Sequence, residues 1–189
     1  YIYEKVCIDI QEMKEIFKEI PKISINISKE SLFEKDFLEK YIKITNKYNV
    51  KPNDIELEIT ERTTVNDDKY MKGILEQVKE KGFGIAIDDF GTGYSSLIML
   101  EVMPIDTLKI DKSFIDRIGI NNKEVNLIEI IMLITKKLKL KTVAEGVEKS
   151  KQVEYLKKIN CDLIQGYFYS KPLDFEAFKN YIKENKNKI

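Results

Sequence analysis

The residues from Gly84 to Gly93 read Gly-Ile-Ala-Ile-Asp-Asp-Phe-Gly-Thr-Gly, a short apolar run that ends in two carboxylates. The β-branched and small residues of this run predict a buried strand over Gly84–Asp88. Two consecutive aspartates cannot both point to one face of a straight strand, so the chain is expected to bend there. The glycines that follow give the backbone the freedom to do so.

The same pattern of a short apolar strand with a polar end recurs along the chain and alternates with amphipathic stretches. The predicted strands are Ile23–Ile27, Ile55–Ile59, Gly84–Asp88, Thr107–Ile110, Lys141–Ala144 and Leu163–Phe168. The predicted helices are Glu12–Glu19, Glu34–Tyr48, Asp67–Lys81, Ser95–Leu100, Glu124–Leu138, Lys151–Ile159 and Phe175–Asn185. Alternation of this kind indicates an α/β fold with parallel strands.

The distribution of the polar strand ends distinguishes two α/β architectures. An open sheet concentrates its site at one switch point, whereas a barrel collects residues from the carboxyl ends of many strands on one rim. Nearly every predicted strand here ends in polar side chains, which favours a TIM-type (β/α)₈ barrel, incomplete with about six of eight strands. No linker-like stretch interrupts the series, so 1–189 is expected to be a single domain, with 1–20 as a leading helix and 21–189 as barrel strands and helices.

The composition excludes several classes of site. The chain has no histidine, which excludes histidine-ligated metals and histidine general bases, and its 32 basic residues balance 32 acidic ones. A net charge of zero argues against a nucleic-acid binder that works through a basic face. No apolar run approaches the roughly 20 residues that span a bilayer. Cys7 and Cys161 match no zinc or redox spacing, which suits a reducing compartment.

Oxygen-bearing side chains gather at the carboxyl ends of three neighbouring predicted strands. They are Asn26, Glu58, Asp88 and Asp89. Grouped carboxylates repel one another and lose hydration unless cations neutralise them. A pair of divalent metals about 3.5–4 Å apart does so and is the apparatus of phosphoester cleavage. The alternative, that these acids cap helices or meet lysines, explains one such residue more readily than four.

Further polar residues follow the later strands. Lys109 shares a strand face with Asp111 and is a candidate for stabilising phosphoryl charge, for forming a Schiff base, or for a buried ion pair with that aspartate. Glu145 is a candidate for completing the metal or water arrangement, while Glu148 either braces a loop or begins a helix. Gln165 offers an amide to a base or a ribose at the last rim position.

Together these residues resemble the EAL domain, a family of bacterial phosphodiesterases that act on cyclic di-GMP. The matching motifs are Asn26-Ile-Ser28, Glu58-Ile-Thr60-Glu61, Asp88-Asp89-Phe-Gly-Thr-Gly, Lys109-Ile-Asp111, Ala-Glu145-Gly-Val-Glu148 and Gln165-Gly-Tyr-Phe-Tyr-Ser-Lys-Pro. Their order along the chain from about Ile23 onward makes the resemblance specific.

The resemblance implies a two-metal site and a role for each catalytic residue. The implied ligands of two Mg²⁺ or Mn²⁺ ions are Asn26, Glu58, Asp88 and Asp89. Lys109 would contact the catalytic water, Asp111 would serve the second metal, and Glu145 would lie near the reacting phosphate. The implied reaction is in-line attack by a metal-activated hydroxide on one phosphodiester, which opens cyclic di-GMP to linear pGpG.

The resemblance also implies residues for substrate binding and for coupling. Gln165 and Gly166 would contact the substrate. Glu148 would hold the loop after Asp89, which the family uses in dimerisation and signalling. The residues of that loop are Gly91, Thr92 and Gly93.

The Glu-Ala-Leu signature that names the family, with its metal-binding glutamate, is expected upstream of Asn26 and does not occur in this chain. The chain is therefore expected to be an N-terminally truncated EAL domain, weak or inactive by itself, which dimerises or rearranges to protect its open sheet edge. The expected partners are cyclic di-GMP, a second copy of the chain, and GGDEF or sensor domains fused in a parent protein. No nucleic-acid polymer and no membrane contact of this segment are expected, and the location is expected to be cytoplasmic even where the parent protein is membrane-anchored.

Two other functions stay open on the sequence. A non-catalytic receptor would bind cyclic di-GMP without cleaving it, and the upstream glutamate would distinguish it from the enzyme. A barrel lyase would use Lys109 as a Schiff base and would need no metal, but it does not account for the acidic rim.

Overall fold

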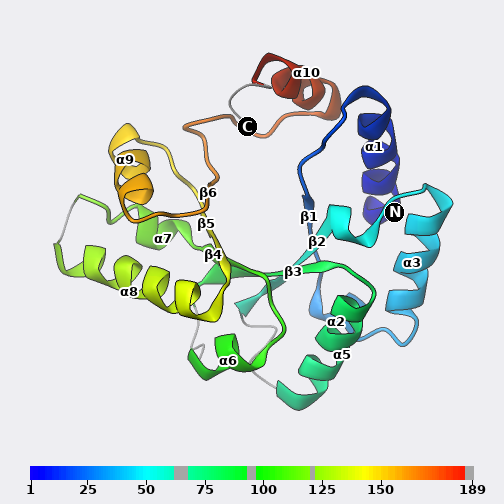
Figure 1. The fold of residues 1–189 in the computed structure, drawn as a ribbon, viewed down its shortest axis with the longest axis horizontal. Helices are drawn as coiled ribbons and strands as arrows, with labels where there is room; N and C mark the ends of the chain where they lie inside the picture. The colour runs from blue at the N-terminus through cyan, green and yellow to red at the C-terminus, as the bar shows by residue number, and fades with distance from the viewer. Residues whose placement is uncertain (62–67, 93–96, 120–121, 186–189) are drawn as a thin grey trace.

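In a computed structural model of the protein, six parallel strands form a curved sheet in the order β1-β2-β3-β4-β5-β6, with helices around its outer side (Figure 1). The strands are β1 (Ile23–Asn26), β2 (Ile55–Thr60), β3 (Gly84–Phe90), β4 (Thr107–Ile110), β5 (Lys141–Ala144) and β6 (Leu163–Ile164). The structure describes residues 1–61, 68–92, 97–119 and 122–185.

Helices or short helical turns lie between successive strands, and one helix stands at each end of the series. They are α1 (Ile2–Ile16), α2 (Lys29–Leu32), α3 (Phe37–Lys47), the 3₁₀ turn η1 (Pro52–Asp54), α5 (Asp68–Glu80), α6 (Leu97–Val102), α7 (Lys112–Ile115), α8 (Asn122–Leu138), α9 (Ser150–Lys158) and α10 (Phe175–Asn185). Because neighbouring strands are parallel and follow one another in sequence, their carboxyl ends reach one rim. The prediction of an incomplete TIM-type barrel is confirmed.

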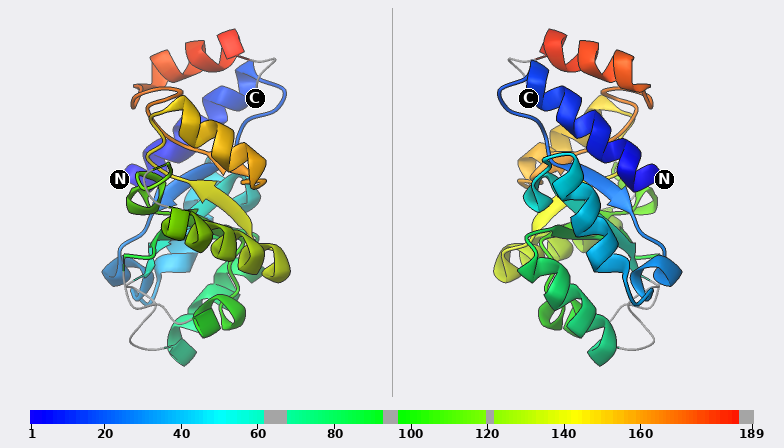
Figure 2. Two further views of the ribbon diagram at one scale, coloured as in Figure 1. Left: turned by 90° about the vertical axis from the view of Figure 1, so that its left-hand side faces the viewer. Right: turned by 90° about the vertical axis from the view of Figure 1, so that its right-hand side faces the viewer.

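Helices α1 and α10 lie side by side next to the interval between β1 and β6 (Figure 2). Lys179 of α10 is only 6% exposed and pairs with Glu12 of α1. The ammonium group of Lys5 on α1 lies 5.4 Å from the centre of the Phe175 ring on α10. In the part of the chain that the structure describes, no further strand pairs with the outer edges of β1 and β6. Helix contacts therefore join the two ends of the sheet where a closed barrel has strands.

The two faces of the sheet differ in polarity. Alternate residues of a strand point to opposite faces, and the set that packs against the helices is apolar and buried: Ile25, Leu57, Ile59, Ile85, Ile87, Leu108 and Ile110. The opposite face carries polar side chains in layers. In the lower layer, Glu56 accepts hydrogen bonds from Thr107 at 2.8 Å and from Ser24 at 3.2 Å. Toward the carboxyl ends of β2 and β4, the next residues on this face are Glu58 and Lys109. They form the upper layer, which lies at the rim.

The structure departs from the sequence predictions mainly at element ends. Helix α1 begins at Ile2, ahead of the predicted Glu12, because its buried residues are spaced by three or four from Tyr3 to Met13. Strand β6 ends at Ile164, ahead of the predicted Phe168. A side chain at Gly166 would meet the backbone of Val147 at 2.1 Å, and the chain turns there. Within the described residues, no helix is long and apolar enough to cross a membrane.

Candidate functional site

Lys109 of β4 lies at the centre of a group of three carboxylates, which come from β2, β3 and the end of β5. Its Nζ atom is 2.8 Å from Glu58 Oε1, 2.8 Å from Glu145 Oε1 and 3.0 Å from Asp88 Oδ1. Between β2 and β4 the facing position of β3 is Ala86, which is in register with both Glu58 and Thr107. Because alanine is small, Lys109 can reach across β3 to Glu58. These contacts place the Lys109 ammonium group on the face of the sheet that carries the carboxylates.

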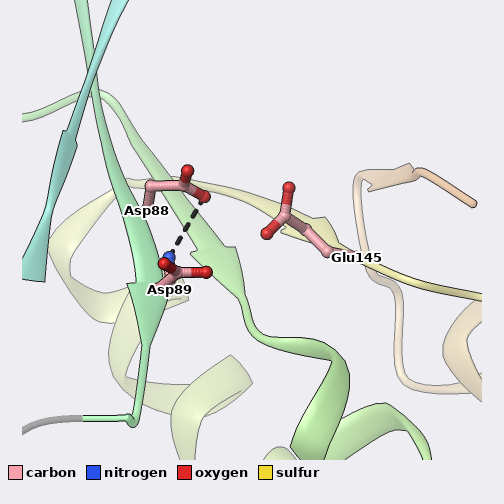
Figure 3. A group of neighbouring side chains, drawn as sticks. All are labelled: Asp88, Asp89 and Glu145. Atoms are coloured by element: carbon pink, nitrogen blue, oxygen red, sulfur yellow. Dashed lines mark hydrogen bonds between the residues drawn. The ribbon is translucent and has the colours of Figure 1, made fainter. Parts of the chain in front are cut away.

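The two aspartates of β3 lie at a break in the strand register. The pairing of β3 with β4 shifts between Ile87 and Phe90, and Asp89 has a φ of 55°. The Asp89 N–H donates a hydrogen bond of 3.1 Å to Asp88 Oδ1. Such an irregularity re-aims the side chains of a strand. As a result, carboxylate oxygens of Asp88, Asp89 and Glu145 lie within 4.8 Å of one another (Figure 3).

The electrostatics of this cluster favour a bound cation. Burial raises the pKa of Glu145 to about 7, with Lys109 acting in the opposite direction and Asp88 adding to the rise. Burial lowers the pKa of Lys109, but its hydrogen bonds to Glu145 and Glu58 outweigh that effect, so the net shift is upward and the group is an ammonium ion. One ammonium group thus pairs with three carboxylates, and a further carboxylate, that of Asp89, lies within 4.8 Å of two of them. The carboxylates fit the oxygen donor set that Mg²⁺ or Mn²⁺ prefers.

Two more predicted site residues lie at the edge of the cluster. Asn26 is in register with Glu58 on the neighbouring strand, and it is exposed. Asp111 caps helix α7, because its Oδ1 accepts a hydrogen bond of 2.9 Å from the Ser113 N–H. Asp111 and Asp89 line the same hollow of about 400 Å³. The structure therefore brings Asp111 to the acidic rim, on the Asp89 side.

The turn that follows Asp89 is held by a residue whose part sequence reasoning missed. The carboxylate of Glu61, a residue only 1% exposed, accepts a hydrogen bond of 2.7 Å from the Gly91 N–H. The Thr92 hydroxyl donates to the carbonyl oxygen of Asp89 at 3.0 Å. The signal was present, because a glutamate directly after a buried strand is at the rim. Gly93, predicted as part of this loop, lies outside the described residues.

The remaining predicted residues gather at a neighbouring hollow of about 480 Å³. Its lining includes Gln165, Gly166, Glu148 and Lys112. The carboxylate of Glu148 pairs with Lys112 Nζ at 2.7 Å. The structure thus places Gln165 and Gly166 next to Glu148, at the side of the acidic cluster where β5 and β6 end.

Comparison with known proteins gives a consistent result. The family model of the EAL domain matches residues 1–172. The cyclic di-GMP phosphodiesterase NbdA of Pseudomonas aeruginosa is 31% identical over 183 residues, which is 97% of this chain and 23% of NbdA. The chain therefore spans less than a quarter of that relative.

Two solved structures similar to this chain contain cyclic di-GMP, according to their descriptions. The PaMucR phosphodiesterase in complex with c-di-GMP superposes with a TM-score of 0.89 at 31% identity, over 94% of this chain and 72% of PaMucR. A manganese and cyclic di-GMP complex of Klebsiella pneumoniae BlrP1 has a TM-score of 0.79 at 25% identity, over 90% of this chain and 44% of BlrP1.

Proposed function

The chain belongs to the EAL domain family, and we propose that its acidic rim hydrolyses one phosphodiester of cyclic di-GMP to give linear pGpG. The observation that carries this proposal is the cluster of Asp88, Asp89 and Glu145, whose oxygens lie within 4.8 Å, with Lys109 paired to two of them. The names of NbdA and of the PaMucR complex support the substrate.

We assign the metal site to the residues at the ends of β1, β2 and β3. The ligands are Asn26, Glu58, Asp88 and Asp89, as the family resemblance implies. The residues fit divalent cations, because they are oxygen donors that carry more negative charge than Lys109 neutralises. When bound there, two Mg²⁺ or Mn²⁺ ions would act as Lewis acids on the phosphate. The manganese complex of BlrP1 supports this choice of metal.

The chain's own residues supply the charge and the proton transfers of the reaction. The Lys109 ammonium group supplies positive charge next to the phosphate oxygens, where negative charge develops. Glu145 accepts the proton of the attacking water, a role that suits a carboxylate whose pKa burial raises to about 7. The water oxygen bonds to phosphorus, the bond from phosphorus to the 3′ oxygen breaks, and that oxygen takes up a proton from solvent water. Glu145 then releases the proton that it accepted to the solvent. Asp111 lines the same hollow as Asp89, and it would serve the second metal there.

We assign substrate binding beyond the phosphate to the hollow at the ends of β5 and β6. Gln165 offers an amide with both donors and an acceptor, which suits the edge of a guanine. Gly166 brings the backbone close, because no side chain fits between it and Val147. The Tyr167 ring is 58% exposed in the same hollow and offers a stacking surface.

We also propose that the protein forms a homodimer in the cytoplasm and works within a longer protein that carries GGDEF or sensor domains. Apolar side chains on α6 and α8 support the homodimer, because they are 45–68% exposed: Ile98, Leu127, Ile130 and Leu133. The free thiols of Cys7 and Cys161 support a reducing compartment. The 23% coverage of NbdA supports the longer protein. Sedimentation at high concentration tests the dimer, and a monomer would contradict it.

The proposed reaction is tested by incubating the longer protein that contains this chain with cyclic di-GMP and Mn²⁺ and separating the products by chromatography. Linear pGpG, absent when a chelator is added, is the expected result. Cyclic di-GMP that is bound but unchanged would instead identify the domain as a receptor.

A further inference from the structure

Two loops of the rim are tied together beside the proposed catalytic residues. The first follows β4 and contains Asp111 and helix α7, and the second, 146–149, follows Glu145 at the end of β5. The backbone of Glu145 is fixed on its strand side, because its N–H donates to the Ile110 carbonyl at 3.0 Å. On its other side comes Gly146, with a φ of +65°. A glycine next to a catalytic carboxylate needs a restraint if the carboxylate is to keep one position.

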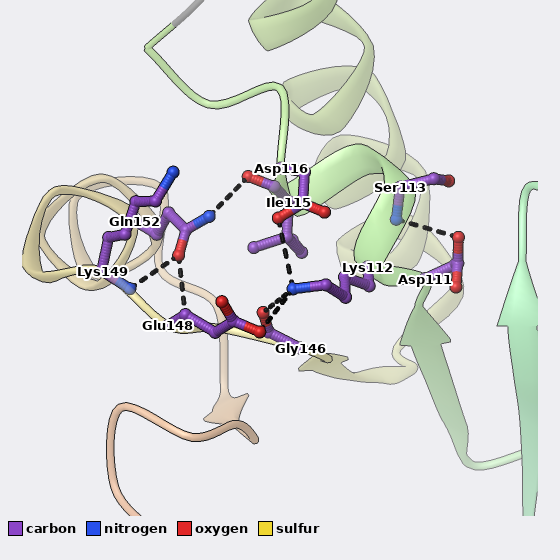
Figure 4. A network of polar contacts seen from close by, with 9 residues as sticks. All are labelled: Asp111, Lys112, Ser113, Ile115, Asp116, Gly146, Glu148, Lys149 and Gln152. Carbon is purple, nitrogen blue, oxygen red and sulfur yellow. Dashed lines mark hydrogen bonds and ion pairs between the residues drawn. The ribbon is translucent and has the colours of Figure 1, made fainter.

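Lys112, at the start of α7, supplies one restraint (Figure 4). Its Nζ atom donates to Glu148 Oε1 at 2.7 Å and to the carbonyl oxygen of Gly146 at 3.3 Å. The stem of the lysine covers Gly146 so closely that an added Cβ would lie 2.5 Å from Lys112 Cγ. The ion pair is half-exposed and by itself adds little to stability. The informative feature is therefore that Lys112 covers Gly146, the residue directly after Glu145.

Gln152, on α9, supplies the second restraint. Its side chain is 2% exposed, and its Oε1 accepts hydrogen bonds of 2.9 Å from the N–H groups of Glu148 and Lys149. Its Nε2 donates at 3.1 Å to the carbonyl oxygen of Ile115, the last residue of α7. One buried amide thus joins the beginning of α9, the loop 146–149 and the end of α7. Lys112 and Gln152 hold α7 to that loop at both ends.

We propose that Lys112 and Gln152 are positioning residues, which keep Glu145 and Asp111 at a fixed separation across the phosphate by locking the loop 146–149 to α7. The proposal rests on the proposed function, since it assigns how that site is held. Neither Lys112 nor Gln152 belongs to the motifs that carry the resemblance to the EAL domain family. Residues that act in this way change turnover more than substrate affinity.

The first test uses Gln152→Glu in the full protein. In its ionised form the glutamate retains acceptors for the N–H groups of Glu148 and Lys149 but cannot donate to the carbonyl oxygen of Ile115. We expect kcat for cyclic di-GMP to fall about tenfold with KM within about twofold, and the α7 amides to exchange hydrogen about tenfold faster. The control Gln11→Glu adds the same charge at an exposed position of α1 and should change neither kcat nor the exchange of the α7 amides.

The second test separates position from stability at Lys112. Lys112→Met keeps the stem and removes both hydrogen bonds, together with an exposed pair with Asp116 at 3.4 Å, so we expect lower kcat and faster exchange of the Val147 amide. Lys112→Arg keeps donors for both acceptors and should restore most of the turnover. The control Lys72→Met removes an exposed pair with Glu76 on α5 and should leave kcat unchanged.

The outcomes distinguish this proposal from the proposed function. Unchanged kcat and unchanged loop exchange in both variants would overturn the positioning role. So would a general loss of stability in which arginine at position 112 gives no rescue. If the unsubstituted protein does not cleave cyclic di-GMP, the proposed function fails. In that case hydrogen exchange still tests the positioning role. Exchange rates in the loop 146–149 that are the same in both variants as in the unsubstituted protein would overturn it.

Discussion

Lys109 Nζ on β4 lies 2.8 Å from Glu58 Oε1 on β2, although strand β3 runs between them. Both side chains are at most 7% exposed, so neither charge is screened well by water. The contact puts an ammonium group in the midst of carboxylates that we assign to metal binding. In the metal-free protein Lys109 is therefore the counter-ion of the site, and its removal should be felt in the fold as well as in the chemistry.

Lys109→Met should destabilise the metal-free protein. Breaking a buried ion pair costs about 3 kcal/mol, because the remaining charges are left without a partner. Unfolding in denaturant with a chelator present measures the loss, and Mn²⁺ should restore most of it by neutralising the same carboxylates. Lys72→Met, at an exposed pair, is the control. Equal stability of Lys109→Met and the unsubstituted protein in chelator would contradict this account of the site.

Glu58→Gln should have the opposite effect, with little loss of stability in the metal-free protein and a weaker stabilisation by Mn²⁺. The amide lowers the repulsion within the cluster, so the free energy of unfolding in chelator should change by less than about 1 kcal/mol. The stabilisation by Mn²⁺, about 2.7 kcal/mol at a hundredfold excess over Kd, should fall by about 1.4 kcal/mol for each tenfold loss of affinity.

Glu56→Gln provides the matched control for that experiment, one layer lower on the same strand. Glu56 binds Thr107 and Ser24 and takes no part in the proposed metal site. It should lose stability with and without metal and keep the full response to Mn²⁺. A Mn²⁺ response that is equally weak in both variants would argue against Glu58 as a ligand.

Gly91→Ala should be more harmful than Gly119→Ala. Both glycines have positive φ angles, +101° and +85°, so both substitutions strain the backbone. Only at Gly91 would the new Cβ overlap a side chain, at 2.0 Å from the Phe114 ring, while nothing lies within 4 Å at Gly119. We expect a difference of about 1–3 kcal/mol in the free energy of unfolding. Adding Phe114→Leu to Gly91→Ala should recover part of it, and no recovery would rule out the overlap.

Glu61→Leu should loosen the turn that carries Asp89. The buried carboxylate accepts the part-buried Gly91 N–H at 2.7 Å, and losing the acceptor of such a donor costs about 1 kcal/mol. Glu61→Gln keeps an acceptor and should lose less than half as much. Chemical unfolding and turnover of cyclic di-GMP measure the effects, with exposed Glu154→Leu as control. If the leucine and glutamine variants are equally stable and active, the hydrogen bond to Gly91 is not what holds the turn.

The sequence was most informative where one physical rule decides the outcome. The period of two along a strand separates the face of Lys109 from that of its neighbours Leu108 and Ile110. In the structure both neighbours are fully buried, and Lys109 lies on the other face. The strand ends predicted the acidic rim for the same reason, because parallel strands deliver their carboxyl ends to one side.

Features that depend on contacts between distant segments were beyond the sequence. Asp88 and Asp89 predict a bend, but the register shift that aims both at Glu145 is set by pairing with β4. Gln152 reads as an ordinary polar residue of an amphipathic helix, and only the fold brings Ile115 to its amide. Helix α7 is one turn long and has too few residues for a periodic pattern, so Lys112 gave no signal of its contact with Gly146.

The most direct test of the central claim is hydrolysis of cyclic di-GMP by the protein with Mn²⁺ in water enriched in heavy oxygen, followed by mass spectrometry of the product. We predict pGpG that carries one heavy oxygen on its terminal phosphate, formed by the unsubstituted protein and not by Glu58→Gln or in the presence of a chelator. Bound but intact cyclic di-GMP, or a product without the label, would contradict the proposal that this acidic rim performs metal-dependent phosphodiester hydrolysis.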